Sequence, residues 1–313
     1  MKRGILDNPM TTLSRRNFLK TSACGAAALL GAEPKLTFPT DPRERLAVTS
    51  WPFRAYMDVP GNRNNGKKLV DAKDFAAMVA ERFDIHNINP LTSHFRSIEP
   101  AYLDELREST AKAGSHIVDL GHGGRPFYHP DAAKRQDAIA FGKRGVDIAV
   151  TIGSPSMRQH INGAPGGKAD VNLAAQTLGE VAAYGEKHDI VVNLENDVPV
   201  AEDPYFLIAV IEKVRSPYLR ALPDFANSMN SRGDAEWNYT AVAAMFEHVF
   251  NMAHVKSAYA DDSGKVYQVD LGRLFAIAKQ AGYRGYFSME AEMPGDPFEN
   301  TRKLAEATIH YLS

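Results

Sequence analysis

Residues 190–196 have the sequence Ile190-Val191-Val192-Asn193-Leu194-Glu195-Asn196, an apolar run that ends in a carboxylate and an amide. The length of this run and its β-branched residues predict a buried strand. Three later apolar runs follow the same pattern, and each supplies one ionisable side chain that could bind a metal ion. The four candidate ligands are Glu195, Asp224, His254 and Glu290.

The intervals between the four candidate ligands are 29, 30 and 36 residues. A strand, a crossover helix and their loops need about 30 residues or more, so each interval fits one strand and one helix. The carboxyl ends of the parallel strands of a barrel meet at one mouth. The spacing therefore predicts that the four side chains converge at the C-terminal mouth of a parallel barrel.

From residue 46 onward, short β-rich runs alternate with amphipathic helical stretches. The helical period is clear at Leu207, Val210, Ile211 and Val214, which are spaced i, i+3, i+4 and i+7. This alternation predicts an α/β fold, a (β/α)8 TIM barrel in a single domain. The alternative is a doubly wound open sheet, which would normally place a glycine-rich phosphate turn after its first strand. We expect strands at residues 46–50, 85–89, 115–120, 147–152, 190–195, 219–224, 252–257 and 285–290.

Residues 1–32 have the features of a twin-arginine signal peptide. The stretch Ser14-Arg15-Arg16-Asn17-Phe18-Leu19-Lys20 matches the twin-arginine pattern, and a short apolar run at residues 23–30 follows it. That run is far shorter than the roughly 20 residues that cross a bilayer, so we expect no membrane insertion after signal removal. We expect export to the periplasm, an extended linker or strap over residues 33–45, and the barrel over residues 46–313.

The composition argues against several classes of function. Without the five basic residues and the one acidic residue of residues 1–32, 31 basic and 37 acidic residues remain, a net charge of −6. Such a chain is a poor partner for nucleic acid. Cys24 is the only cysteine and lies in the signal segment, so the mature chain would offer no thiolate nucleophile, cysteine-ligated zinc or iron–sulfur cluster. The state of assembly is open, and a homo-oligomer is one alternative.

Two stretches rich in glycine, asparagine and proline, residues 56–68 and 153–170, are expected to follow strands. Loops longer than about 12 to 15 residues are usually functional or disordered. Both stretches are expected at the same mouth as the four candidate ligands, so we interpret them as walls or lids, with Arg158 and His160 as lid residues. The alternative is a pair of mobile loops without a role.

The residue types at the mouth indicate an ion and a reaction. Taken singly, a glutamate after a strand is more often a solvated strand end or a helix N-terminal charge than a ligand, and His254 alone could be a core histidine. Together, the four would leave charge unpaired in a dry mouth unless a metal compensates it. Three carboxylates and one imidazole favour Mn, Mg or Co, and zinc stays open. Such an ion polarises a carbonyl group. Glu195 and Glu290 are expected to flank a substrate, where one takes a proton and the other returns it.

Two further residues are candidates for catalysis. Lys256 lies two residues after His254 and should face the same side of its strand; the alternative is a salt bridge with Glu292 or Asp224. His122 follows the third expected strand and could act as an additional acid or base near neutral pH. The alternative for His122 is a structural loop histidine.

The sequence around the four candidate ligands resembles the xylose isomerase-like TIM barrels of the sugar phosphate isomerase/epimerase superfamily, over essentially the whole mature chain. The resemblance implies a metal ion held by Glu195, Asp224, His254 and Glu290, with Glu195 and Glu290 as the acid and base. Asn227 stands where family members often have a histidine. The matching motifs are Asn193-Leu194-Glu195-Asn196, Pro223-Asp224-Phe225-Ala226-Asn227, Ala253-His254-Val255-Lys256 and Ser288-Met289-Glu290-Ala291-Glu292.

Several side chains are candidates for contact with a small carbohydrate substrate. Trp51 and Phe53 could supply a flat apolar surface on which a sugar stacks, and core packing is the alternative for both. The full set of substrate-binding candidates is Trp51, Phe53, Arg158, His160 and Asn227.

Three functions are consistent with these residues. The first is a divalent-metal-dependent sugar isomerase or epimerase that abstracts a proton next to the carbonyl group of an unphosphorylated sugar. The second is a lyase or hydratase that cleaves 3-keto-glycosides by elimination, and export favours it because glycosides reach the cell envelope. The third is a non-catalytic sugar-binding barrel. A DNA-repair endonuclease of the same superfamily would need more histidine ligands and a basic face.

Overall fold

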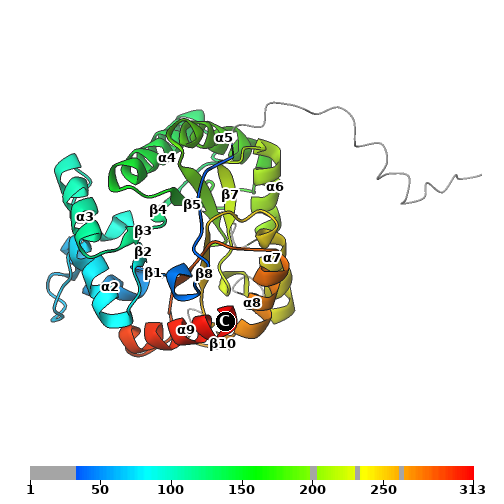
Figure 1. Ribbon diagram of the computed structural model, residues 1–313. Helices are drawn as coiled ribbons and strands as arrows, with labels where there is room; N and C mark the ends of the chain where they lie inside the picture. Colours follow the sequence, from blue (N-terminus) through cyan, green and yellow to red (C-terminus); the bar gives the residue numbers. More distant parts are fainter. Residues whose placement is uncertain (1–32, 198–202, 230–232, 261–263) are drawn as a thin grey trace, which may run out of the picture. The chain divides into compact units, whose positions relative to one another are not determined.

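The computed structural model describes residues 33–197, 203–229, 233–260 and 264–313. Within these residues, strands form the centre and helices surround them (Figure 1). The central strands are β1 (Leu46–Thr49), β2 (Asn87–Asn89), β3 (His116–Ile117), β4 (Leu120–Arg125), β5 (Ser156–Ile161), β6 (Val191–Glu195), β7 (Leu219–Leu222), β8 (Met252–Val255) and β11 (Tyr286–Met289). The helices are α2 (Phe75–Phe83), α3 (Pro100–Lys112), α4 (Ala132–Ile152), α5 (Val171–His188), α6 (Pro204–Val214), α7 (Ala235–Phe246), α8 (Leu271–Gln280) and α9 (Pro297–Leu312).

The barrel closes through two groups of parallel strands. One group has the order β3-β2-β1-β11-β8 and the other has the order β4-β5-β6-β7. Parallel bridges between Leu91 and Gly121 and between Asp224 and His254 join the two groups. With β3 and β4 as successive parts of one unit, strands and helices alternate eight times. The chain is therefore a (β/α)8 TIM barrel, and the predicted fold class is confirmed.

The fourth barrel strand is β5, so the strand expected at residues 147–152 is wrong. Those residues are the end of α4, where Val146, Ala149 and Ile152 are buried at helical spacing. Gly153 ends the helix in the left-handed region, with a φ of 76°. A short apolar run with β-branched residues fits a strand and a buried helix segment equally well, which explains the error.

This shift also changes the two expected loops. Residues 153–170 contain β5, so Arg158 and His160 are strand residues, and the interpretation of this stretch as one lid loop is wrong. Residues 56–68 do follow β1 and are anchored by the bridge between Met57 and Val70. A wall or lid role for residues 56–68 stays a prediction.

Aspartate side chains begin six of the helices in the described part of the chain. Each carboxylate accepts a hydrogen bond from a backbone N–H group of the first turn, which would otherwise lack a partner. The negative charge also lies at the positive end of the helix dipole. The capping residues of α4 to α9 are Asp131, Asp170, Asp203, Asp234, Asp270 and Asp296. Part of the acidic excess of the chain therefore serves helix formation.

A layer of buried polar side chains lies inside the barrel beneath its C-terminal mouth. Asn193 on β6 donates hydrogen bonds to Asp119 Oδ1 and to Asn251 Oδ1, both at 3.0 Å. Ser156 donates to the same Asp119 oxygen at 2.6 Å and accepts a hydrogen bond from Asn251 Nδ2 at 2.8 Å. Asn193 and Glu195 are two residues apart on one strand and so face the same side. The hydrogen-bonded polar layer therefore lies directly beneath Glu195 inside the barrel.

The segment before β1 packs against the opposite, N-terminal end of the barrel. Residues 33–42 contain no helix or strand, and a short 3-10 helix, η1 (Arg43–Arg45), follows them. The ring of Phe38 contacts the rings of Phe250 and Tyr286 edge to face, with ring centroids 5.8 and 6.0 Å apart. The expected signal peptide, residues 1–32 with Cys24, lies outside the described residues. No helix within the described ranges combines the length and apolar character needed to span a bilayer.

We predict that Gly153→Ala lowers the free energy of unfolding by about 1–2 kcal/mol, because a side chain disfavours the left-handed backbone that ends α4. An added Cβ would have no heavy atom within 4 Å, so the cost is backbone strain alone. Gly61→Ala is the matched control, since Gly61 also has open space but no left-handed φ. Urea denaturation measures both variants. Equal stabilities for the two would contradict the assignment.

Candidate metal centre and adjoining pocket

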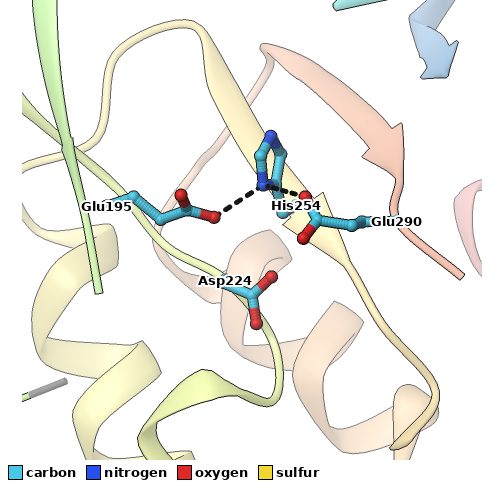
Figure 2. Close-up of side chains that lie close together, drawn as sticks. All are labelled: Glu195, Asp224, His254 and Glu290. Carbon is cyan, nitrogen blue, oxygen red and sulfur yellow. Dashed lines mark hydrogen bonds and ion pairs between the residues drawn. The ribbon is translucent and has the colours of Figure 1, made fainter. Parts of the chain in front are cut away.

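The four candidate ligands meet at the C-terminal mouth of the barrel (Figure 2). Glu195 ends β6, Asp224 follows β7, His254 lies in β8 and Glu290 follows β11. All four side chains are buried, and one ligand atom from each lies within 4.8 Å of the others. The structure therefore brings together the residues that the strand spacing places at one mouth.

Two carboxylates approach the same imidazole nitrogen from opposite sides (Figure 2). His254 Nδ1 lies 2.7 Å from Glu195 Oε1 and 2.8 Å from Glu290 Oε2. Asp224 Oδ1 accepts backbone hydrogen bonds from Ala226 and Asn227, at 2.9 and 2.8 Å. These contacts leave one oxygen of Asp224 directed toward the space between the other ligands.

The other imidazole nitrogen fixes which atom of His254 faces the carboxylates. Asn89 Nδ2 donates hydrogen bonds to the backbone oxygen and to Oδ2 of Asp119, both at 3.0 Å. The carbonyl oxygen of the Asn89 amide therefore faces His254 Nε2 at 2.8 Å and accepts its hydrogen. A histidine held in this way presents Nδ1 as a ligand atom.

Burial and pairing act against each other on the charges of the centre. Burial lowers the pKa of His254, but the charges of Glu195 and Glu290 outweigh it and raise this pKa to about 10. Burial opposes the charge on Glu195, but Arg158 and His254 hold the pKa of that carboxyl well below its usual range. Burial, against the opposing charge of Lys256, raises the pKa of Asp224 to about 7.

The centre fits a divalent cation. Among the described residues, Asp224 Oδ2 is a buried oxygen without a hydrogen bond, and Glu290 Oε2 has only the shared contact with His254 Nδ1. Leaving a buried oxygen such as Asp224 Oδ2 unsatisfied costs about 1–3 kcal/mol, and a cation between the four candidate ligands would satisfy it. Three carboxylate ligands and one imidazole are a donor set that suits Mn, Mg or Co, with zinc also open. The buried cluster could therefore bind a metal ion.

The second oxygen of Glu195 contacts two residues of β5. Arg158 Nη1 donates to Glu195 Oε2, and His160 Nε2 lies 2.8 Å from the same oxygen. Asp197 Oδ2 lies 3.4 Å from His160 Nε2. Both oxygens of Glu195 are thus engaged, one toward His254 and one toward the β5 residues.

Lys256 lies between the centre and the pocket beside it. Its Nζ lies 3.0 Å from Glu290 Oε1, 2.8 Å from Glu292 Oε2 and 3.6 Å from Asp224 Oδ2. Nζ also donates to Asn227 Oδ1 at 2.8 Å. The salt bridges that were the alternative for this lysine are present, and its position at the pocket keeps a catalytic role open.

A pocket of about 270 Å³ adjoins the centre. Trp51 forms part of its wall; the ring stacks on His94, and Nε1 donates to Glu292 Oε1. This volume is just below the range for drug-sized ligands, roughly 300–1,000 Å³, and so fits a small ligand. The lining residues are Trp51, Leu91, Arg158, His160, Asp197, Asn227, Lys256, Tyr259, Glu290 and Glu292. Four of the five substrate-binding candidates are among them.

Phe53 and His122 are not part of this pocket. Phe53 is fully buried and packs against the rings of Phe75 and Phe298, so the expectation that it contacts a sugar is corrected to core packing. His122 is buried, stacks on Phe141 and has Nε2 3.1 Å from the Phe141 carbonyl oxygen. Its assignment as a catalytic acid or base is corrected to a structural histidine.

Several residues of the site escaped prediction. Asn89 ends the second expected strand, residues 85–89, and Asp119 lies one residue before the end of the third, residues 115–120, so both carried a weak positional signal. Asp197 lies two residues after Glu195, which places it near the mouth. Tyr259 belongs to β9 (Ala258–Ala260), which pairs antiparallel with β10 (Val266–Gln268) in an insertion between β8 and α8. No periodicity in the sequence indicates that this hairpin reaches the pocket.

The structural assignment of His122 predicts a pH dependence of stability. Burial lowers the pKa of folded His122 to about 4, from 6.5, so the unfolded chain binds more protons between these pH values. The stabilising contribution is complete above pH 6.5 and is lost as the pH falls toward 4. In His122→Asn, the fall in the free energy of unfolding between neutral and acid pH should be smaller by up to about 3 kcal/mol. Urea denaturation between pH 7 and 4.5 measures it; parallel curves for variant and wild type would contradict the assignment.

Comparison with known proteins agrees with the fold. A D-allulose 3-epimerase from Methylomonas sp. superposes with a TM-score of 0.66 at 14% identity, covering 88% of this chain and 100% of that chain. A xylose isomerase-like TIM barrel protein from Mycobacterium smegmatis, in complex with magnesium, superposes with a TM-score of 0.62 at 18% identity. The match covers 88% of this chain and 97% of that chain. A 3-keto-D-glucoside 4-epimerase from E. coli superposes with a TM-score of 0.61 at 13% identity, and the match covers 85% of this chain and 98% of that chain. At these identities the similarity shows the fold alone.

Sequence comparison identifies the family. No curated protein matches the chain. A family model described as "Xylose isomerase-like TIM barrel" matches residues 75–312, which is most of the described barrel. Together with the closed parallel barrel, this match shows that the chain belongs to the xylose isomerase-like TIM barrel family.

Proposed function

We propose that the protein is a divalent-metal-dependent isomerase or epimerase that acts on an unphosphorylated sugar by proton transfer next to a carbonyl group. The observation that carries this proposal is the placement of Glu195 and Glu290 on opposite sides of one buried imidazole, beside a pocket of suitable size. Two carboxylates so placed can remove a proton from one face of a substrate carbon and return one from the other face.

The ion would be held by Glu195, Asp224, His254 and Glu290, and it would supply positive charge to stabilise the developing charge on the substrate carbonyl oxygen. Asn89 would keep His254 Nδ1 turned toward the ion. Arg158 and His160 would hold Glu195 in place.

The pocket charges support an unphosphorylated substrate. Arg158 and Lys256, the arginine and the lysine that line the pocket, are both buried and ion-paired with carboxylates. Asp197, Glu290 and Glu292 line the same pocket. A phosphate group would have to displace these pairs and would meet an excess of negative charge. A neutral sugar would avoid both costs.

Export through the twin-arginine pathway stays a prediction from the sequence, because residues 1–32 lie outside the described residues. Export favours a free sugar or glycoside, since sugar phosphates are cytoplasmic metabolites. Two of the solved barrels of this fold are named as epimerases of allulose and of 3-keto-glucoside, which supports sugars as the substrate class.

The same proton removal on a 3-keto-glycoside could end in loss of the glycosidic substituent. Elimination is therefore the alternative outcome of the assay below. A non-catalytic sugar-binding barrel is the third outcome, and it would show no exchange of substrate protons with solvent.

We predict that Glu195→Gln and Glu290→Gln each lower turnover by about 10²-fold or more, because each removes a group that transfers a proton. The assay follows deuterium uptake next to the carbonyl group by NMR, with free ketoses and with 3-keto-glucosides in D₂O and Mn²⁺. Glu299→Gln is the control, since that glutamate is an exposed surface partner of Arg302. Full activity in either site variant, or no exchange by the wild type, would contradict the proposal.

We also predict that metal affinity rises with pH. Burial lowers the pKa of His254, but Glu195 and Glu290 raise it to about 10, and burial raises the pKa of Asp224 to about 7. The ion must displace the protons of both groups. Apparent affinity for Mn²⁺ should therefore rise about tenfold per pH unit above pH 7 and more steeply below it. Calorimetric titration between pH 6 and 9 measures this slope, and a flat profile would contradict the proposed ligands.

A further inference from the structure

We propose that the guanidinium of Arg158 occupies the place beside Glu195 where a second metal ion could otherwise bind. The centre would then bind one divalent ion and not two. This inference rests on the proposed metal function and specifies the number of ions. Arg158 would be a positioning residue that acts through Glu195.

A second set of ligand types lies next to the four candidate ligands. One ligand atom from each of His160, Glu195 and Asp197 lies within 4.8 Å of the others. Glu195 belongs to both sets, with Oε1 toward His254 and Oε2 toward His160. A carboxylate shared in this way could bridge two ions, so the donor set alone does not limit the centre to one.

The guanidinium of Arg158 already lies within this second set. Its Nη1 donates to Glu195 Oε2 and lies 2.7 Å from His160 Nε2. An ion bound to the same two atoms would overlap Nη1 and would repel its charge. Arg158 and a second ion are therefore mutually exclusive.

The fold holds Arg158 in this position. The side chain starts on β5, is buried, and reaches Glu195 at the end of the neighbouring strand β6 through Nη1. At Gly121, the residue paired with Arg158 on β4, an added Cβ would lie 2.8 Å from Arg158 Nη2. The absence of a side chain at Gly121 therefore provides the space that the guanidinium occupies.

One ion agrees with the proposed reaction. A single cation can polarise one substrate oxygen during proton transfer, whereas paired ions stabilise the attacking and leaving oxygens of in-line displacement. Arg158 would fix Oε2 of Glu195 and leave Oε1 toward the ion. The arginine would thus favour the chemistry of carbonyl compounds over that of phosphodiesters.

The test is the number of Mn²⁺ ions bound by the full chain, measured by equilibrium dialysis with metal analysis, together with electron paramagnetic resonance for coupled Mn²⁺ pairs. We expect one ion in the wild type and one in Arg158→Lys, which keeps the charge. Arg158→Met should bind two ions with a coupled signal. The double variant Arg158→Met/His160→Ala should return to one ion, because it lacks a ligand of the second position.

The outcomes separate this inference from the proposed function. A wild type that binds no ion would overturn the metal function itself. A wild type that binds one ion, with Arg158→Met also binding one, would overturn only the role of Arg158. Two ions in the wild type at saturating Mn²⁺ would overturn this inference whether or not Arg158→Met folds.

Discussion

The structure depends on how buried carboxylates at the mouth of the barrel are compensated. Glu195, Asp224 and Glu290 are buried around His254, and uncompensated charge there would cost more than a typical domain can spare. Arg158 and Lys256 compensate part of it from two sides. The remainder requires either protons or a divalent ion. The same deficit of positive charge that opposes folding is what a bound divalent ion could relieve.

The barrel makes this arrangement precise because each ligand is attached to a strand. Register along β6 places Asn193 in the polar layer and Glu195 at the mouth, and Asp119 links that layer to Asn89 and His254. Strand register and this chain of hydrogen bonds thus fix the orientation of the candidate ligand side chains. Metal-ligating histidines generally depend on such outer partners. The surrounding helices, α4 to α9 of which begin with a capping aspartate, pack around the strands of the closed barrel.

The sequence was most informative where function follows local pattern. Glu195 and its three partners stand at strand ends, so their intervals predicted both the barrel and their convergence. The errors arose where local pattern is ambiguous. Residues 147–152 fit strand and helix equally well, and Phe53 and His122 have the right residue types but face the core. Asn89 was missed because its role exists only through contacts with residues distant in the chain.

The central claim is that one cation is held between Glu195, Asp224, His254 and Glu290. The most direct test is an anomalous difference map from crystals of the full chain grown with Mn²⁺, collected near the manganese absorption edge. We predict a single strong peak within bonding distance of all four side chains. A map without a peak among them, or with the ion bound elsewhere, would contradict the account.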